Sequence, residues 1–217
     1  AAVGDPNESN GTIDWRWDGP VTALVEFQGQ LYAGGSFNNI GRTAATNVAR
    51  WDGNQWTDVP LFGSAIDGVS ALAVFQGELY AGGFSGSLPG GGEYRHIARY
   101  DGTQWRAAGA GVEAANPQTP VFVSAFAVHN GALYVGGQFA RAGNVLASGI
   151  ARWDGTRWSP VGDGIASGSV RELASFNEAL IAGGDFELQQ GGQTIRRLVR
   201  WNGQEWSRVG SGGGDAV

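Results

Sequence analysis

Few side chains in this sequence could perform acid–base or metal chemistry. The chain of 217 residues has two histidines, His96 and His129, and no cysteine. His96 ends the segment Glu93-Tyr94-Arg95-His96, and a histidine near a carboxylate can move protons in catalysis. A polar loop tip is the simpler interpretation, and two histidines without cysteine do not make a typical zinc site. The sequence therefore predicts no metal, no cofactor and no catalytic residue. We expect His129 to fill an aromatic position, as explained below.

Carboxylates offer a second kind of chemistry, the paired acids that cleave glycosidic bonds. Candidates in the second half of the chain are Asp163, Glu172, Asp185 and Glu187. Because the chain has 20 acidic residues, such a choice is always available and does not single out these four. A glycan-active enzyme would need these acids, or the His96 segment, to converge in one pocket. That function stays open as an alternative.

Pairs of aromatic residues recur on either side of a short Asp-Gly or Asn-Gly segment. The pairs are Trp51 and Trp56, Tyr100 and Trp105, Trp153 and Trp158, and Trp201 and Trp206. Aromatic residues that flank a tight turn can meet across a hairpin and stabilise it. Exposed tryptophans at the same places would instead suit stacking on sugar rings. The pairs therefore predict structural contacts, with a multivalent carbohydrate-binding lectin as the alternative.

An arginine precedes each aromatic pair. These arginines are Arg50, Arg99, Arg152 and Arg200. Because the same residue type recurs in every copy, we expect a structural role. Each arginine would bridge neighbouring repeats or pair with the turn aspartate (Asp52, Asp101 or Asp154; Asn202 in the last copy).

The aromatic pairs close four copies of one repeat. The copies open with ALVEFQGQLYAGG, ALAVFQGELYAGG, AFAVHNGALYVGG and ELASFNEALIAGG. In the third, His129 replaces the aromatic residue Phe27, Phe75 or Phe176. The second glycine of each motif is Gly35, Gly83, Gly137 or Gly184, so the unit repeats about every 50 residues. The predicted repeats are 21–60, 69–111, 121–162 and 170–210, after an N-terminal segment, 1–20, with a stray strand and before a Gly-rich tail, 211–217.

Each repeat predicts four short antiparallel strands, which we label a to d. In the first repeat, strand a covers 23–27, strand b 31–33 and strand c 48–51, and strand d surrounds Trp56. Strand a is apolar at nearly every position, which is typical of a strand covered on both faces. Tight turns join a to b and c to d, and no stretch of ten residues has helical periodicity. The pattern predicts an all-β fold, a β-propeller of four-stranded blades.

The repeats resemble the kelch motif of the galactose-oxidase type of β-propeller. The resemblance rests on the Gly-Gly pair after strand b, the aromatic before the c–d turn and the tryptophan after it. The third repeat, with LYVGGQF and IARWDGTRWSPVGDG, is more similar to secreted, uncharacterised bacterial propeller repeats. The resemblance covers 21–210 and implies the fold but no single function. The copper chemistry of galactose oxidase needs a cysteine-linked tyrosine, so the lack of cysteine excludes that activity.

Both ends of the sequence lie in phase with the repeat. Near the start, Arg16-Trp17-Asp18-Gly19 copies the segment 50–53, and SRVGSGGGDAV after Trp206 matches the residues after Trp158. Either the four blades close a small ring, capped by the N-terminal strand, or they form part of a larger propeller. The start at Ala1-Ala2 is compatible with cleavage after a signal peptide, so we expect a processed protein in the extracellular space or periplasm.

Charge and hydropathy exclude two classes of partner. A net charge of −6 and a pI of 4.8 argue against a nucleic acid, which needs a basic surface. No apolar run approaches the roughly 18 residues of a membrane span, so we expect no membrane insertion.

Sequence variation between repeats is concentrated in two sets of loops. The a–b and c–d turns are short and alike, whereas the b–c loops (SFNNIGRTAAT, FSGSLPGGGEYRH, QFARAGNVLAS and DFELQQGGQTIRR) and the d–a loops, including EAANPQTPVF, differ. In a propeller these two variable sets share one face, and variable loops on a rigid scaffold commonly carry specificity. Drift of unconstrained loops is the simpler explanation. The expected binding residues are Arg42, Tyr94, Arg95, His96, Arg141, Gln189, Arg196 and Arg197.

These observations predict a secreted, non-catalytic interaction module or assembly subunit. Its partner would be a protein or a larger extracellular assembly, bound through the b–c and d–a loop face. The lectin is the first alternative and the glycan-active enzyme the second.

Overall fold

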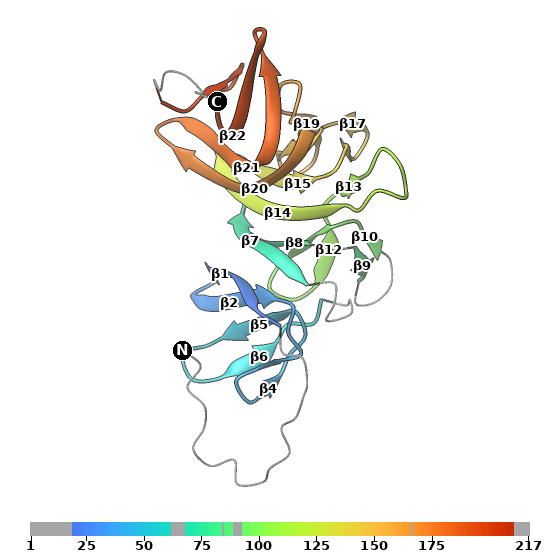
Figure 1. Cartoon of the computed structure of the whole chain (residues 1–217). Coiled ribbons are helices and arrows are strands. Elements are labelled where there is room, and N and C mark those ends of the chain that lie inside the picture. Colours follow the sequence, from blue (N-terminus) through green and yellow to red (C-terminus); the bar gives the residue numbers. More distant parts are fainter. Residues whose placement is uncertain (1–18, 62–67, 84, 89–92, 166, 211–217) are drawn as a thin grey trace, which may run out of the picture.

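The computed structural model describes residues 19–61, 68–83, 85–88, 93–165 and 167–210 (Figure 1). Within these ranges the chain forms strands and no helix, as the sequence predicts. No helix that could cross a membrane is therefore found in the described part of the chain. The stray strand expected within 1–20 and the tail 211–217 lie almost entirely outside the described residues.

Four antiparallel sheets of four strands make up most of the molecule, and each holds its strands in the order a, b, c, d. Sheet 1 consists of β1 (Val21–Phe27), β2 (Gln30–Gly35), β5 (Val48–Trp51) and β6 (Trp56–Asp58). Sheet 2 consists of β7 (Val69–Phe75), β8 (Glu78–Gly83), β11 (Ile97–Tyr100) and β12 (Trp105–Ala107). Sheet 3 consists of β14 (Phe122–His129), β15 (Ala132–Gln138), β18 (Ile150–Trp153) and β19 (Trp158–Pro160). Sheet 4 consists of β20 (Ser167–Phe176), β21 (Ala179–Gln190), β22 (Gln193–Trp201) and β23 (Trp206–Arg208).

Short strands that the sequence did not predict lie in the loops between these sheets. In the b–c loop of sheet 1, β3 (Asn39–Ile40) pairs with β4 (Thr43–Ala44), and in that of sheet 2, β9 (Gly86–Ser87) pairs with β10 (Glu93–Tyr94). A third set joins the d–a connection after sheet 2 to the b–c loop of sheet 3, through β13 (Val112–Glu113), β16 (Arg141–Ala142) and β17 (Val145–Leu146). Two-residue strands are too short for an alternating pattern to reveal them.

The tight turns have the chemistry that the repeated sequence implies. Gln28 and Gly29 in the a–b turn of sheet 1 have φ angles of 52° and 75°, which suit a type I′ hairpin turn. In the c–d turn of sheet 3, Asp154 Oδ1 accepts hydrogen bonds from the main-chain N–H groups of Thr156 (2.8 Å) and Arg157 (2.7 Å). These bonds stabilise the turn and lower the pKa of Asp154 to about 2.

The repeated arginines face a tyrosine on the neighbouring strand. Arg50, Arg99 and Arg152 each hydrogen-bond to the tyrosine hydroxyl opposite them on strand b, that of Tyr32, Tyr80 and Tyr134. Pairing with the turn aspartate is wrong for Arg99, which pairs with Glu78 at 3.1 Å; bridging of neighbouring repeats stays a prediction. The turn aspartates use one oxygen for main-chain N–H groups, and the cross-strand tyrosine lies on the same face as the arginine.

Successive sheets pack face to face, strand a against strand a, in the order of the chain. Strand β7 packs against β1, β14 against β7, and β20 against β14. In Figure 1 the sheets form a row from sheet 1 near the N-terminal end to sheet 4 near the C-terminal end. Because β1 and β20 lie at opposite ends of this row, the four sheets do not close a small ring within the described residues.

This open row explains why one expectation about strand a is wrong for the first sheet. Strand β1 was expected to be covered on both faces, but most of its residues are exposed. In sheets 2 and 3, β7 and β14 lie between neighbouring sheets and are mostly buried or half-buried. Sheet 1 has no preceding sheet among the described residues, so the apolar composition of β1 does not lead to burial here.

The aromatic pairs lie mainly in the core. Their ring centroids are 5.4, 4.9, 4.7 and 5.2 Å apart in sheets 1 to 4. Trp105, Trp153, Trp158, Trp201 and Trp206 are buried, whereas Trp51, Trp56 and Tyr100 are half-buried. The pairs therefore make the structural contacts across the c–d hairpin that the sequence predicts.

Candidate loop-face site

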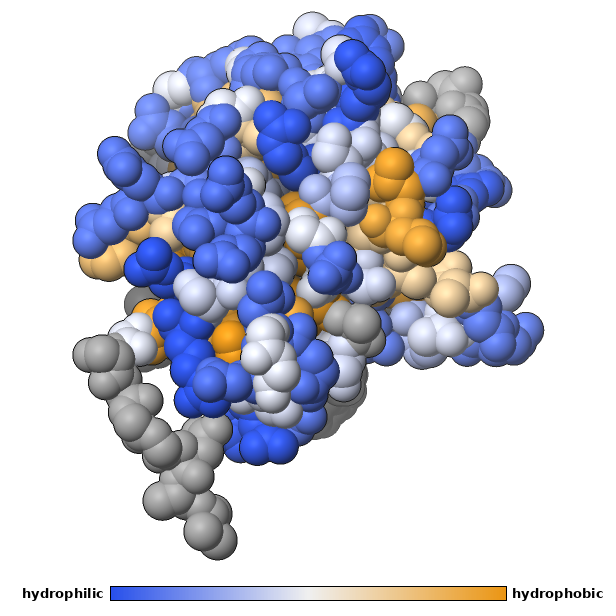
Figure 2. All heavy atoms as spheres, turned by 90° about the horizontal axis from the view of Figure 1, so that it is seen from above, coloured by the Kyte–Doolittle hydropathy of each residue, from blue (hydrophilic) through white to orange (hydrophobic). Residues whose placement is uncertain are grey.

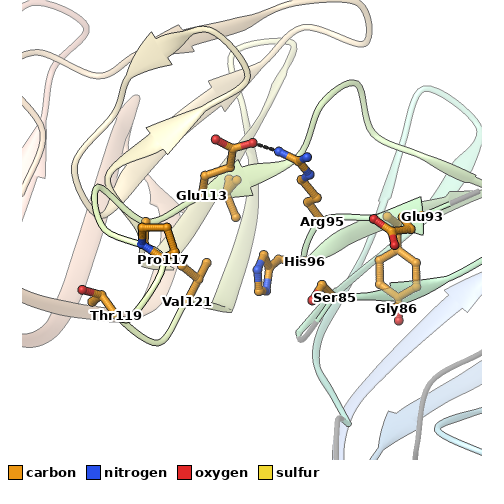
Figure 3. A pocket seen from close by; sticks show the side chains of 12 residues that line it. Ser85, Gly86, Glu93, Arg95, His96, Glu113, Pro117, Thr119 and Val121 are labelled. Carbon is orange, nitrogen blue, oxygen red and sulfur yellow. Dashed lines mark ion pairs between the residues drawn. The ribbon is translucent and has the colours of Figure 1, made fainter.

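A pocket lies between the b–c loop of sheet 2 and the d–a connection that leads to sheet 3 (Figure 3). It has a volume of about 510 Å³. One wall comes from the b–c loop, and the other from β13 and the segment after it. The lining residues are Ser85, Gly86, Glu93, Tyr94, Arg95, His96, Val112, Glu113, Ala114, Pro117, Thr119 and Val121. A variable b–c loop and a variable d–a connection thus line the same pocket.

Main-chain hydrogen bonds hold these two walls together. The N–H of Val112 donates to the Arg95 oxygen at 3.1 Å, which joins the d–a connection to the b–c loop of sheet 2. On its other side, the Glu113 oxygen accepts a hydrogen bond from the N–H of Ala140 at 2.8 Å, in the b–c loop of sheet 3. The connection is therefore fixed between two b–c loops, and the three segments form one continuous surface.

Charged side chains of opposite sign face each other at this pocket. Arg95 and Glu113 form an ion pair, and in Figure 3 their side chains point toward one another from the two walls. Both are partly exposed, so the pair contributes little to stability, about 0–1 kcal/mol. Its effect is to hold both groups in place across the pocket.

The position of His96 is set by the repeat rather than by the pocket. His96 has a φ of 67°, and the equivalent residues of the other repeats, Asn47, Gly149 and Arg197, have 65°, 69° and 66°. Its main-chain oxygen accepts the N–H of Gly83 at 3.0 Å. A left-handed residue is therefore a standard feature of the b–c loop where it enters strand c.

The imidazole of His96 is not arranged for proton transfer to a carboxylate. Its Nδ1–H donates to the main-chain oxygen of Gly83 at 3.2 Å. Burial lowers the pKa of His96, the Gly83 hydrogen bond opposes that shift, and nearby Arg95 adds to it. The ring therefore favours its neutral form, which makes it a polar contact in the pocket wall.

The structure divides the predicted binding residues among several places. It brings Tyr94, Arg95 and His96 together in the pocket, and it places Arg141 on β16, whose main chain pairs with β13. The guanidinium of Arg141 donates to the Asn144 oxygen at 3.1 Å. These four residues belong to one continuous surface.

The other four predicted residues lie elsewhere. Arg42 is between β3 and β4 in the b–c loop of sheet 1. Arg196 and Arg197 line a separate pocket of about 410 Å³ on sheet 4, where Arg196 pairs with Glu187 at 2.8 Å. Gln189 hydrogen-bonds to Thr194 at 2.9 Å across the β21–β22 hairpin.

Sequence reasoning missed the second wall of the pocket. The divergent segment EAANPQTPVF was noticed, but none of its residues was selected. Glu113, Pro117, Thr119 and Val121 from this segment line the pocket, and Thr119 also lines a second one of about 440 Å³. The unusual length of this d–a connection was the signal that could have identified them.

The described residues give little support to glycosidase, acid–base or metal chemistry. Asp185 pairs with Arg171 at 2.7 Å and Glu187 with Arg196, so two of the four candidate acids form exposed ion pairs. His129 is buried in the aromatic position, as expected, and its Nδ1 lies 2.8 Å from Ser175 Oγ. The described ranges contain no cluster of three or more His, Cys, Asp or Glu residues suited to a metal ion.

No family model matches the chain, and no curated protein matches it.

Proposed function

We propose that the chain forms four blades of a kelch-like β-propeller and works as a secreted, non-catalytic interaction module. It binds a protein partner, or a larger extracellular assembly, through the b–c and d–a loops. Four antiparallel sheets of four strands, packed in chain order through their a strands, support the propeller arrangement. The resemblance of the repeats supports the kelch-like type.

One observation supports the loop face most directly. The b–c loops of sheets 2 and 3 and the d–a connection between them are hydrogen-bonded into a single surface that contains the pocket of about 510 Å³. Its side chains are varied and charged, whereas the a–b and c–d turns are short and repetitive. A fixed surface of varied chemistry suits selective recognition of a partner.

The burial of the tryptophans weakens the lectin alternative. Sugar stacking at repeated sites needs an aromatic face open to solvent on each sheet. Five of the seven tryptophans in the described residues are buried, and Trp158 and Trp206 are also bound through their indole N–H groups. A sugar site built on the repeated tryptophans therefore has no accessible indole ring in sheets 3 and 4.

Charge reversal on the two sides of the molecule tests the proposed face. The test variant carries Arg95→Glu and Arg141→Glu on the loop face. The control carries Arg106→Glu and Arg157→Glu beside the c–d turns, which makes the same change in net charge. Each immobilised protein is used to capture partners from the extracellular fraction of its source, with quantification by mass spectrometry. We expect a partner of the wild type to be lost with the test variant and kept with the control.

Two other outcomes would count against the proposal. Loss of the partner only in the control would place the working face on the c–d side. Capture of glycans, but not of any protein, on both variants would favour the lectin.

A further inference from the structure

The three junctions between neighbouring sheets are built in the same way. Each preceding sheet offers the first glycine of its Gly-Gly pair, and the following sheet fills that space with two apolar residues of strand a. The three sets are Gly34 with Val69 and Leu72, Gly82 with Val123 and Phe126, and Gly136 with Val170 and Leu173. A Cβ added at Gly34 would lie only 2.7 Å from Val69 Cγ1, so the fit leaves no room for a side chain.

Sheet 4 presents the glycine half of a fourth junction, and no following sheet fills it among the described residues. Within the same ranges, a Cβ added at Gly183 would meet only Leu198 Cδ1 at 3.7 Å and the Arg197 oxygen at 3.8 Å, both from its own sheet. Leu198 is 46% exposed, although its counterparts Val48, Ile97 and Ile150 are fully buried. Phe176 is 63% exposed at the end of β20, where Phe27 and Phe75 are buried in their own sheets.

Sheet 1 presents the other half of such a junction, the two apolar residues of strand a. Val21 and Leu24 occupy the positions of Val69 and Leu72, with the β-bulge at the same place in the strand. They are 46% and 60% exposed, whereas Val170 and Leu173 in sheet 4 are buried. Leu31 is also exposed, although Leu79, Leu133 and Leu180 at the same repeat position are fully buried. The residues that fill a junction are thus present and uncovered.

The two faces lie at opposite ends of the row of sheets (Figure 1). Glu26 pairs with Leu31 across β1 and β2 and shares its face. The glycine face of sheet 4 carries both an acidic residue, Glu172 opposite Gly183, and a basic one, Arg200 opposite Ile181. Figure 2, which looks down from the sheet 4 end, shows orange hydrophobic atoms interrupting a mainly blue surface. The faces are therefore complementary in shape and hydropathy, and Arg200 offers a partner for Glu26.

We propose that the glycine face of sheet 4 in one copy of the chain binds the strand-a face of sheet 1 in a second copy. The contact reproduces the internal junctions between separate molecules. The contact is heterologous, because two different faces meet. Repeated contacts therefore build either a closed ring or an open array of chains, depending on the rotation between one chain and the next. The proposal does not depend on the loop face, which these contacts leave accessible.

The geometry of the internal junctions shows where an engineered disulfide between two chains could detect this contact. A Cβ added at Gly136 lies 3.2 Å from the Cβ of Val170, a few tenths of an ångström from the separation found in disulfides. Gly183 and Val21 are the corresponding residues of the outer faces. Because the wild type contains no cysteine, Gly183→Cys and Val21→Cys introduce single, uniquely placed thiols.

The first experiment mixes these two single-cysteine variants under mild oxidation. We expect a cross-linked product of two chains on a non-reducing gel, and little product from either variant alone. The matched control mixes Gly183→Cys with Leu146→Cys, since Leu146 is exposed but lies on neither face. Equal cross-linking in the control would overturn the proposal. So would fast-migrating single chains as the main product of the Val21→Cys/Gly183→Cys double variant, because they would show closure within one chain.

Sedimentation velocity gives a second, independent test. Leu24→Arg blocks the sheet 1 face and Leu198→Arg blocks the sheet 4 face, so each variant alone should stay at the single-chain mass of 22.6 kDa. An equal mixture retains one working face of each kind, and we expect it to form two-chain particles and nothing larger. A wild type that remains a single chain at all concentrations would overturn the proposal, as would a mixture that does not associate.

Discussion

The indole Nε1–H of Trp158 donates to the main-chain oxygen of Ala108 at 3.2 Å and joins sheet 3 to the end of strand d in sheet 2. Trp206 makes the same bond to Val161 at 3.2 Å across the next junction. The repeated tryptophan therefore stabilises its own hairpin and also links two sheets. Truncation of this side chain should therefore lower the stability of the whole row of sheets.

Replacing Trp158 with Ala should lower the free energy of unfolding by about 3–5 kcal/mol, because a large buried aromatic leaves a cavity. Trp158→Phe keeps most of the packing and loses the N–H donor, so we expect a smaller loss. Urea denaturation of the three proteins measures the difference. A Trp158→Ala protein that unfolds like the wild type but no longer binds glycans would favour the lectin.

Gly136→Ala should destabilise the protein by about 1–3 kcal/mol, since its Cβ would lie 2.5 Å from Val170 Cγ1 in a packed junction. Gly183→Ala is the matched control, because the same position of sheet 4 has open space. Thermal unfolding of dilute samples compares the two. Equal losses would show that Gly136 is required for some reason other than the junction.

His96→Asn should reduce the sensitivity of the protein to mild acid. The pKa of His96 is lowered in the folded state, so the unfolded chain binds the proton more readily and stability falls as pH drops through the normal histidine range. Asparagine already holds the same left-handed position at Asn47 in sheet 1. Denaturation midpoints at pH 7 and pH 5 should therefore fall further for the wild type than for His96→Asn. An identical fall in both proteins would contradict this role.

Asp154→Asn tests the c–d turn at lower pH. Its pKa of about 2 lies below the usual aspartate value of 3.8, so its contribution is present above pH 4 and disappears as pH falls toward 2. Asn202 shows that an amide also accepts the turn N–H groups, from Gln204 and Glu205, both at 2.9 Å. The stability of the wild type relative to Asp154→Asn should decrease between pH 4 and pH 2. A constant difference over that range would rule out the titration.

Much of the fold could be predicted because each strand ends at a residue with distinctive local chemistry. The aromatic Trp51 and the aspartate after it mark the end of strand c, and the predicted range 48–51 matches β5. Glycines with positive φ, such as Gly29, mark the hairpin turns. These signals are local, so the sequence alone reveals them.

Features that depend on neighbours in space could not be predicted in this way. The exposure of β1 follows from the lack of a preceding sheet among the described residues, which its apolar sequence does not show. Arg50 hydrogen-bonds to Tyr32, a residue 18 positions earlier in the sequence that lies opposite it on the neighbouring strand. The pocket at His96 exists because Val112 and Arg95 are hydrogen-bonded between two loops distant in sequence.

Hydrogen exchange with and without a captured partner tests the proposed working face most directly. The account predicts slower exchange on binding in the b–c loop residues 93–96 and 139–143 and in the connection 111–121, with little change in the a–b and c–d turns. Slower exchange confined to those turns, with no change around Arg95 and Glu113, would contradict it.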